Sequence, residues 1–382
     1  MKQNNRDIRL GVIGADRRGL ISLLAHHPEQ GSRLTSVCSL SSKYFDLYRD
    51  RCGACTAFTK DYREVLADPK LDAVFICTPD HLHEEHALAA FAAGKHVFLE
   101  KPMAITIEGC DRILAAARKY RVKLYVGHNM RFFPVMRQMH KLIASGAIGR
   151  VQAIWCRHFV SYGGDAYFKD WHSERRFTHG LLLQKGAHDI DIIHWLGGAY
   201  TSRVVGMGKL SVYDRQARRP KGRKAPEVDV CPAHWPASAS RDYSPVLDIE
   251  DHSMLLMQLA NGVQASYQQC HYTPDDHRNY TIIGDAGRLE NLGDSSTPEH
   301  WATVHLWNQR TGYSEVGHKV FRIPHLDGTH GGSDPLLIED FLCFLRGKRS
   351  KGATKRDARM AVATGYLGTQ SLRSGNIPLD IP

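Results

Sequence analysis

The chain has 382 residues, more than one hydrophobic core usually organises, and this length suits two domains. Hydrophobic residues make up 42% and charged residues 24%, a balance that excludes a disordered chain. The formal net charge of +10 favours anionic ligands, and no apolar stretch has the length that a membrane span needs.

The first seven residues, MKQNNRD, are polar and lead into a predicted strand, so we expect no signal peptide. The nine cysteines are an odd, scattered set, which predicts free thiols in a cytoplasmic protein. Cys52 and Cys55 form a CxxC pair without a second pair, so we interpret them as structural. The basic run 215–224 has no interleaved aromatic residues, so we expect a solvated loop and neither a nucleic-acid nor a membrane partner.

The first third of the chain alternates short apolar runs with helical patterns. We expect strands at residues 8–13, 34–38, 73–77, 96–99 and 124–127, and helices at 17–27, 43–51, 83–93 and 107–120. Short, continuously apolar strands between helices indicate a parallel sheet covered on both faces. The N-terminal part therefore predicts a doubly wound α/β domain.

After about residue 128 the segments become longer and richer in β-branched and aromatic residues. We expect helices at 134–145, 186–196, 334–346 and about 358–374, and strands at 151–161, 202–212, 253–259, 262–269, 280–284 and 303–307. This pattern predicts an α+β domain with a large, mostly antiparallel open sheet, and domains of residues 1–127 and 128–382. The long basic loop 214–246 is typical of a functional or mobile segment.

A glycine turn joins the first strand to the first helix. Such a turn presents N–H groups and the positive end of a helix to a bound pyrophosphate. Gly14 allows the tight turn, and Gly19 allows close packing of helix on strand. Asp16 stands where a full dinucleotide fingerprint has a further glycine, and its carboxylate repels a pyrophosphate unless it turns away. Arg17 and Arg18 could offset that charge.

The end of the second strand carries Ser39, where an acidic residue usually binds the adenosine ribose. Without the acid, the repulsion against a ribose phosphate is also absent. NAD and NADP therefore both stay open as cofactors.

Three further motifs follow in order. They are Cys77-Thr-Pro-Asp-His-Leu-His83, Glu100-Lys101-Pro102, and Gly180-Leu-Leu-Leu-Gln-Lys-Gly-Ala-His-Asp-Ile-Asp191. Together with the glycine turn, they resemble the glucose–fructose oxidoreductase, inositol dehydrogenase and rhizopine catabolism family (Gfo/Idh/MocA). The similarity covers nearly the whole chain, including the helix at Arg131 and Pro134, the segment 283–290 and the closing Ser371–Gly375.

The resemblance implies a Rossmann domain followed by an α/β domain with an open sheet. It implies an NAD(P)-dependent dehydrogenase that acts on CH–OH groups of a sugar, glycoside or cyclitol. Many relatives associate through the open sheet, because a bare apolar sheet face is unusual in a monomer, so we expect a homodimer or homotetramer. Two alternatives stay open: an NAD-dependent glycoside-cleaving enzyme, and a non-catalytic dinucleotide or sugar sensor, which Asp16, Ser39 and Gln184 favour.

Three residues are implied in catalysis. Lys101 matches the family's catalytic lysine, and its ammonium can stabilise a developing alkoxide at the carboxyl edge of the sheet. His188 matches the general acid/base, since an imidazole titrates near neutral pH. Gln184 stands where relatives commonly have aspartate, so it can hydrogen-bond a hydroxyl but cannot take a proton.

The same resemblance assigns the remaining contacts. Cofactor contacts are expected from Gly14, Ala15, Asp16, Arg17, Arg18, Ser39, Thr78, Pro79, His83, Glu100 and Lys101. Substrate contacts are expected from Lys101, Arg131, Trp171, His188, Asp191 and His330. The histidines at 81, 83 and 86 have no acidic or cysteine partner at metal-ligand spacing, so we expect no metal.

Overall fold

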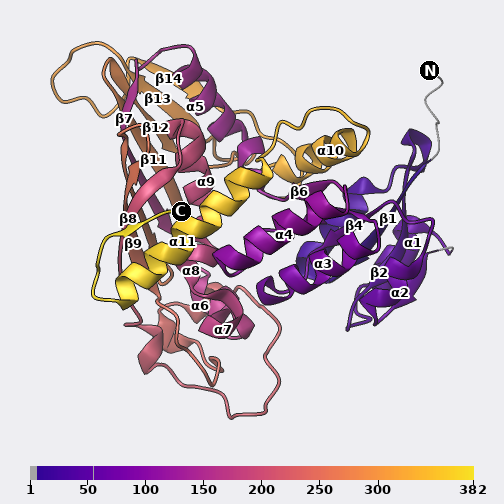
Figure 1. The fold of residues 1–382 in the computed structure, drawn as a ribbon. Helices are drawn as coiled ribbons and strands as arrows, with labels where there is room; N and C mark the ends of the chain where they lie inside the picture. Colours follow the sequence, from indigo (N-terminus) through magenta and orange to yellow (C-terminus); the bar gives the residue numbers. More distant parts are fainter. Residues whose placement is uncertain (1–6, 55) are drawn as a thin grey trace. The chain divides into compact units, whose positions relative to one another are not determined.

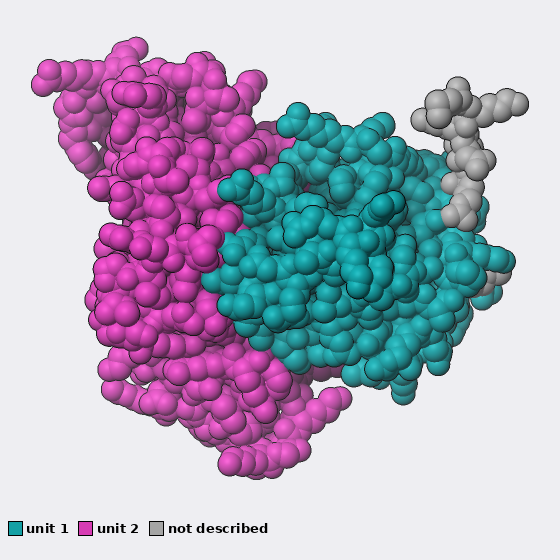
Figure 2. All heavy atoms as spheres, in the orientation of Figure 1, with its two compact units in different colours: residues 1–129, 334–359 teal, residues 130–333, 360–382 magenta. Residues whose placement is uncertain are grey.

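The fold is described from a computed structural model that covers residues 7–54 and 56–382. Two compact units make up the chain: residues 1–129 with 334–359, and residues 130–333 with 360–382 (Figure 2). We call them the first and the second unit. The domain limits expected from the sequence, 1–127 and 128–382, stay a prediction.

The first unit contains a six-stranded parallel sheet of order β3-β2-β1-β4-β5-β6. Its strands are β1 (Ile8–Ile13), β2 (Ser32–Cys38), β3 (Ala57–Thr59), β4 (Ala73–Ile76), β5 (His96–Leu99) and β6 (Leu124–Val126). The strand order reverses between β1 and β4, so connections leave these two strands in opposite directions. Ligands of doubly wound sheets bind at such a switch point, beyond the carboxyl ends of the strands.

Helices cover this sheet. They are α1 (Phe45–Cys52), α2 (Tyr62–Ala67), α3 (His83–Ala92), α4 (Ile107–Lys119) and, from much later in the chain, α10 (Ser333–Leu345). β4 is buried at every position, which explains its continuous apolar sequence AVFI. Phe341 of α10 packs edge-on against Phe75 and Phe98 of the sheet, with ring centroids 5.2 and 5.3 Å apart.

The second unit contains a nine-stranded sheet of order β14-β13-β12-β11-β7-β10-β9-β8-β15. Its strands are β7 (Val151–Phe159), β8 (Thr201–Lys209), β9 (His252–Leu259), β10 (Gln264–Cys270), β11 (His277–Gly284), β12 (Gly287–Leu292), β13 (Thr303–Trp307), β14 (Lys319–Arg322) and β15 (Leu379–Asp380). Every pair is antiparallel except β7 with β10. The predicted fold class, a Rossmann sheet plus a mostly antiparallel sheet, is therefore confirmed.

Among the described residues, the helices of this unit cover one face of the large sheet and leave the other face exposed (Figure 1). The helices of this unit are α5 (Pro134–Ala144), α6 (Gly163–Tyr167), α7 (Arg175–Thr178), α8 (Leu181–Gln184), α9 (Gly186–Gly197) and α11 (Lys355–Arg373), whose first turn belongs to the first unit. β9 alternates buried and exposed residues along its length, as expected for a sheet covered on one side.

Some elements differ from the expectations. The short strands β3, β14 and β15 and the helix α2 were not predicted, because two to six residues carry too little periodicity. The segment after the glycine turn is a 3₁₀ helix, η1 (Arg17–Ala25), rather than the start of an α-helix. The basic loop 214–246 contains short 3₁₀ turns and is anchored by Tyr243 and the adjoining Tyr213, whose ring stacks on Phe168 at 4.3 Å.

Among the described residues, no helix combines the length and the apolar character that crossing a membrane requires. The cysteines within residues 7–54 and 56–382 are free thiols. The second member of the predicted CxxC pair, Cys55, lies outside the described residues.

Candidate active site

In the glycine turn, backbone atoms lie very close to the α-carbons of Gly14 and Gly19. Gly14 has φ +83°, and a Cβ there would come within 2.8 Å of the backbone of Cys77 and Thr78. A Cβ on Gly19 would lie 2.1 Å from the carbonyl oxygen of Gly14. Both glycines are therefore required by close backbone approach, and the turn forms the kind of cradle in which N–H groups meet a pyrophosphate. The residues present fit a dinucleotide at this point.

The carboxylate of Asp16 points toward the end of β2. Its Oδ1 accepts a hydrogen bond of 2.8 Å from the hydroxyl of Ser39, the first residue after that strand. Ala15 is buried beside it, and its carbonyl accepts from the Tyr48 hydroxyl at 3.2 Å. The turn therefore holds the charge of Asp16 at one defined place near the second strand.

Arg18 is held by two carboxylates. Its Nε lies 2.7 Å from Oε1 of Glu100, and its Nη1 lies 2.6 Å from Oδ2 of Asp334. Asn129 donates a further hydrogen bond of 3.3 Å to Asp334. Burial by itself would lower the pKa of Arg18, but Glu100 and Asp334 raise it above its usual value. Arg17 is exposed and has a positive φ of 44°.

The loop after β4 and the turn after β5 are fastened together by a histidine. Nδ1 of His83 lies 2.7 Å from the carbonyl oxygen of Pro102, and its Nε2 lies 2.9 Å from that of Thr78. Glu100 accepts a hydrogen bond of 3.2 Å from the backbone N–H of Lys101. Lys101 is half-buried and follows β5 at the carboxyl edge of the sheet.

The predicted Thr78-Pro79 segment lies in the same loop and leads into the 3₁₀ helix η3 (Asp80–Leu82). The Thr78 hydroxyl lies 3.0 Å from Nδ1 of His86. Burial lowers the pKa of His86 to about 4, so this imidazole is neutral at ordinary pH. His83 and His86 thus both contact Thr78, in the loop after β4, and His83 also contacts Pro102, after β5.

In the second unit, α8 and α9 bring Gln184 and His188 to one helical face, one turn apart. Gln184 is buried and His188 is half-buried. Asp191, on the same face, forms a bidentate ion pair with Arg131, whose Nε and Nη2 lie 2.8 and 2.7 Å from its two oxygens. The Arg131 guanidinium also lies 5.5 Å from the centre of the Trp195 ring.

Asp189 is fully buried and connects α9 to the large sheet. Its carboxylate accepts a hydrogen bond from the Tyr280 hydroxyl, lies 3.1 Å from Nδ1 of His158, and forms an ion pair of 3.1 Å with Nε of Arg278. Burial alone would raise the pKa of Asp189, but the attraction of Arg278 and His158 and the hydrogen bonds hold it below its usual value. The residue next to His188 is thus fixed to three strand side chains.

Lys185, between Gln184 and α9, lies among aromatic rings. Its ammonium donates to the Tyr162 hydroxyl at 3.2 Å and lies 5.6 Å from the ring centres of Tyr162 and Tyr167. Burial by itself would lower the pKa of Lys185, but the two phenols raise it above its ordinary value.

The remaining predicted residues are Trp171 and His330. Trp171, in the 3₁₀ turn η5 (Trp171–Ser173), stacks on His172 with ring centroids 3.7 Å apart. His330 is exposed in the loop before α10 and has a positive φ of 53°.

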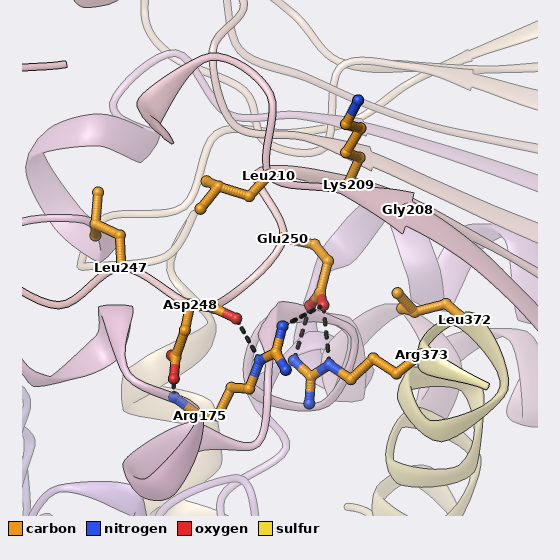
Figure 3. A pocket seen from close by; sticks show the side chains of 9 residues that line it. All are labelled: Arg175, Gly208, Lys209, Leu210, Leu247, Asp248, Glu250, Leu372 and Arg373. Atoms are coloured by element: carbon orange, nitrogen blue, oxygen red, sulfur yellow. Dashed lines mark hydrogen bonds and ion pairs between the residues drawn. The ribbon is translucent and has the colours of Figure 1, made fainter. Parts of the chain in front are cut away.

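The second unit also contains a hollow of about 550 Å³ (Figure 3). It is lined by Arg175, Gly208, Lys209, Leu210, Leu247, Asp248, Glu250, Leu372 and Arg373. Figure 3 shows Arg175 and Arg373 converging on Glu250, and Arg373 makes both of its bonds to that carboxylate at 2.9 Å. None of the predicted site residues lines this hollow, whose charged groups largely neutralise one another.

The structure thus brings together several predicted residues within each unit: Asp16 with Ser39, Arg18 with Glu100, Thr78 with His83, and Arg131 with Asp191. The sequence interpretation did not assign the roles of Asp334 and Asp189. A signal for Asp189 existed, since an acid inside the apolar stretch of a helix needs a buried partner.

Comparisons with known proteins agree with this architecture. Residues 8–128 match the family model described as "Oxidoreductase family, NAD-binding Rossmann fold". Residues 140–381 match the model described as "Oxidoreductase family, C-terminal alpha/beta domain".

Two relatives illustrate the range of similar sequences. The 1,5-anhydro-D-fructose reductase of Ensifer adhaerens is 32% identical over 213 residues, which are 54% of this chain and 63% of the relative. The myo-inositol 2-dehydrogenase of Thermotoga maritima is 27% identical over 205 residues, which are 54% of this chain and 59% of the relative. These alignments span less than two thirds of each relative.

Solved structures share the fold. Levoglucosan dehydrogenase in complex with NADH and levoglucosan superimposes with a TM-score of 0.79 at 20% identity, covering 99% of this chain and 100% of that one. The aldose-aldose oxidoreductase of Caulobacter crescentus gives a TM-score of 0.74 at 19% identity, covering 98% of this chain and 100% of that one. The chain belongs to the Gfo/Idh/MocA family of oxidoreductases, with an NAD-binding Rossmann domain at its N-terminal end.

Proposed function

We propose that this protein transfers a hydride between a nicotinamide dinucleotide and a CH–OH carbon of a sugar, glycoside or cyclitol. The observation that supports the proposal is the position of the two residues that match the family's lysine and histidine. Lys101 follows a parallel strand at the carboxyl edge, and His188 lies half-buried in the first turn of α9. The sugar and cyclitol substrates in the names of the relatives support the substrate class.

The cofactor is NAD or NADP, held at the turn that Gly14 and Gly19 keep free of side chains. When bound, the dinucleotide supplies the hydride acceptor or donor at its nicotinamide ring. Ala15, Asp16 and Arg17 of the turn, and Ser39 beyond β2, are the proposed contacts on the adenosine side. Thr78, Pro79, His83, Glu100 and Lys101 are the proposed contacts from the loops after β4 and β5.

In the proposed reaction, a ring nitrogen of His188 takes the hydroxyl proton during oxidation and returns it during reduction. The Lys101 ammonium is proposed to donate a hydrogen bond to a substrate oxygen and to stabilise its developing negative charge. Gln184, one helical turn before His188, donates to or accepts from a neighbouring substrate hydroxyl. Trp171 and His330 are proposed substrate contacts.

Arg131 and Asp191 are proposed substrate contacts, and Asp191 could also orient His188. Their bidentate ion pair supports the positioning role, because it fixes the face of α9 that carries His188.

A test of the function uses purified protein, NAD or NADP, and a panel of sugars, glycosides and cyclitols, with absorbance of the reduced nicotinamide as the readout. Lys101→Ala should lower kcat by about 10² to 10³, and His188→Ala by about 10² to 10⁴. The exposed residues Lys119 and His300 provide matched controls as alanine variants, whose turnover should stay at the wild-type level.

Undiminished turnover by a folded Lys101→Ala protein would contradict the assignment. Cleavage of a glycoside without accumulation of reduced nicotinamide would instead assign the glycoside-cleaving reaction. Dinucleotide binding without turnover on any compound would assign a sensor.

We further propose that the protein is a homodimer or homotetramer associated through the bare face of the large sheet. Leu256 of β9, Ser266 of β10 and Trp155 of β7 are directly opposed in the register, and Leu256 and Trp155 are 57% and 50% exposed. Met207 and Met254 pair with each other on the same face, two residues away along the strands, and are 50% and 37% exposed. A Trp155→Asp, Leu256→Asp protein should elute as a monomer with light-scattering detection; an unchanged mass would contradict this interface.

The other expected partners follow from the same function. A small-molecule sugar or polyol is the proposed substrate, and no nucleic acid or membrane takes part. A cytoplasmic location is proposed because the free thiols persist in a reducing compartment. Fractionation of cells that produce the protein tests the location.

A further inference from the structure

The acid that is missing from the end of β2 has a counterpart across the glycine turn. Ser39 stands where the family's ribose-binding acid is expected, and its hydroxyl lies 2.8 Å from Oδ1 of Asp16. The backbone N–H groups of Gly14 and Ala15 donate to the carbonyl oxygen of Cys38 at 3.0 and 3.2 Å, so the turn is bonded directly to the end of the strand. The Asp16 carboxylate is therefore one hydrogen bond away from the place where relatives carry theirs.

The carboxylate is held rigidly and still has capacity to bind. Ser39 is buried, and its Oγ also accepts from the backbone N–H of Ser41 at 3.2 Å, which fixes the direction in which it donates to Asp16. Asp16 itself is half-buried, and among the described residues no hydrogen bond is made to its Oδ2. Its φ of −88° and ψ of 157° are ordinary extended values, so the backbone accepts a side chain without strain.

We propose that Asp16 takes over the role of the absent acid: it binds the adenosine ribose hydroxyls and repels a 2′-phosphate, so that the protein selects NAD over NADP. The inference rests on the proposed dinucleotide function and adds a specificity-determining residue to it. A carboxylate accepts hydrogen bonds from ribose hydroxyls, whereas the carboxylate and a 2′-phosphate are both negatively charged and repel each other at close range.

Arg18 and Lys43, two cations of this unit, do not reverse this selection. Arg18 is held by Glu100 and Asp334, so its charge is balanced by two carboxylates away from β2. Lys43, the basic residue after β2, is exposed, and its ammonium lies 5.5 Å from the centre of the Tyr44 ring. The Asp16 carboxylate, in contrast, is anchored at the end of the strand by Ser39.

The test is a direct binding titration of the full chain with NADH and with NADPH, read by nicotinamide fluorescence, and needs no substrate. The wild type should bind NADH at least about tenfold more tightly than NADPH, as expected for one close charge repulsion. Asp16→Asn, which keeps the shape and removes the charge, should abolish this ratio, chiefly by tightening NADPH. Asp16→Gly combined with Ser39→Asp, which restores the family arrangement, should recover it.

The matched control is Asp46→Asn, which removes an exposed carboxylate from α1 of the same unit and should leave the ratio unchanged. Equal or tighter binding of NADPH by the wild type would overturn the inference. So would an Asp16→Gly protein that binds both dinucleotides more tightly by the same factor, since the carboxylate would then be only an obstacle. Either result leaves the proposed reaction intact, whereas NADH selection without turnover on any sugar would contradict the reaction and keep this inference.

Discussion

The two units of this protein use their interiors differently. In the first unit, aromatic rings such as those of Phe75, Phe98 and Phe341 pack against one another in the core of the sheet, and the ion pairs of Arg18 lie beyond the strand ends. The second unit buries a charge network of Asp189 and Arg278 under α9. A substitution at Phe341 should have the cost of a cavity, whereas one at Asp189 should have the cost of an unpaired buried charge. The two places should therefore respond differently to mutation.

The chain offers a natural probe for this comparison, because all its tryptophans are in the second unit. They are Trp155, Trp171, Trp195, Trp235, Trp301 and Trp307. Tryptophan fluorescence therefore reports unfolding of the second unit, while far-UV circular dichroism reports both.

The largest effect should come from Asp189→Asn. The substitution leaves the buried Arg278 without its closest counter-charge, which should cost about 3 to 5 kcal/mol of unfolding free energy. Urea denaturation followed by tryptophan fluorescence measures it. Asp214→Asn, which removes an exposed i,i+4 ion pair in the same unit, should cost less than about 1 kcal/mol. Equal costs for the two variants would contradict the expectation that the buried charge of Asp189 stabilises this unit more than an exposed ion pair does.

Phe341→Ala should have the next largest effect, on the first unit. It opens a cavity between α10 and the parallel sheet, for an expected loss of about 3 kcal/mol. The loss should appear in circular dichroism and leave the tryptophan transition in place if the units unfold separately. Glu339→Ala, exposed on the same helix, is the control and should change stability by less than about 0.5 kcal/mol.

Part of the acid response should come from the second unit, through His158. Burial, together with the nearby Arg278 guanidinium, lowers the pKa of His158 to about 3. Its pKa in the unfolded chain is about 6.5, so between these values the unfolded state binds a proton that the folded state refuses. The stabilisation is complete above about pH 6.5 and decreases as the pH falls, by up to about 1.4 kcal/mol per pH unit.

His158→Gln should make the dependence of unfolding free energy on pH less steep by that amount between pH 6.5 and 4.5. The exposed His300 serves as the control, and its glutamine variant should keep the wild-type slope. A slope that both substitutions leave unchanged would show that acid sensitivity arises elsewhere.

The smallest effects should be those on the surfaces, where the units are alike. Glu84→Gln removes an ion pair with Arg112 in the first unit, and Glu174→Gln removes one with Arg176 in the second. Each should cost less than about 1 kcal/mol, and salt should diminish even that. A large cost in one unit alone would mean that the contrast extends beyond the interiors.

Much of the first unit could be predicted from the sequence, because its strands are continuously apolar and its motifs stand at strand ends. Gly14 and Gly19 predicted a tight turn, and in the structure each has backbone atoms too close for a side chain. The direction of Asp16 could not be predicted. It depends on Ser39, a residue of another strand, and a local pattern contains no information about that contact.

The second unit was predictable in type but not in its contacts. Alternating strands and the helix at 186–196 were visible, whereas the partners of Asp189 come from β7 and β11, far away in sequence. The ion pair of Arg131 with Asp191 was likewise not predicted, because each residue was interpreted by its match to a substrate position. The roles of Lys101, His188 and Gln184 stay predictions until the variants are measured.

The helix α10 has a consequence for synthesis on the ribosome. Asp334 holds Arg18, Asp340 accepts from the Tyr125 hydroxyl at 2.9 Å, and Phe341 fills the sheet, yet residues 130–333 are translated in between. At about 5 to 20 residues per second, that segment takes about 10 to 40 s to emerge. During that time the nascent first unit has no α10, so Phe75 and Phe98 are not yet packed against Phe341.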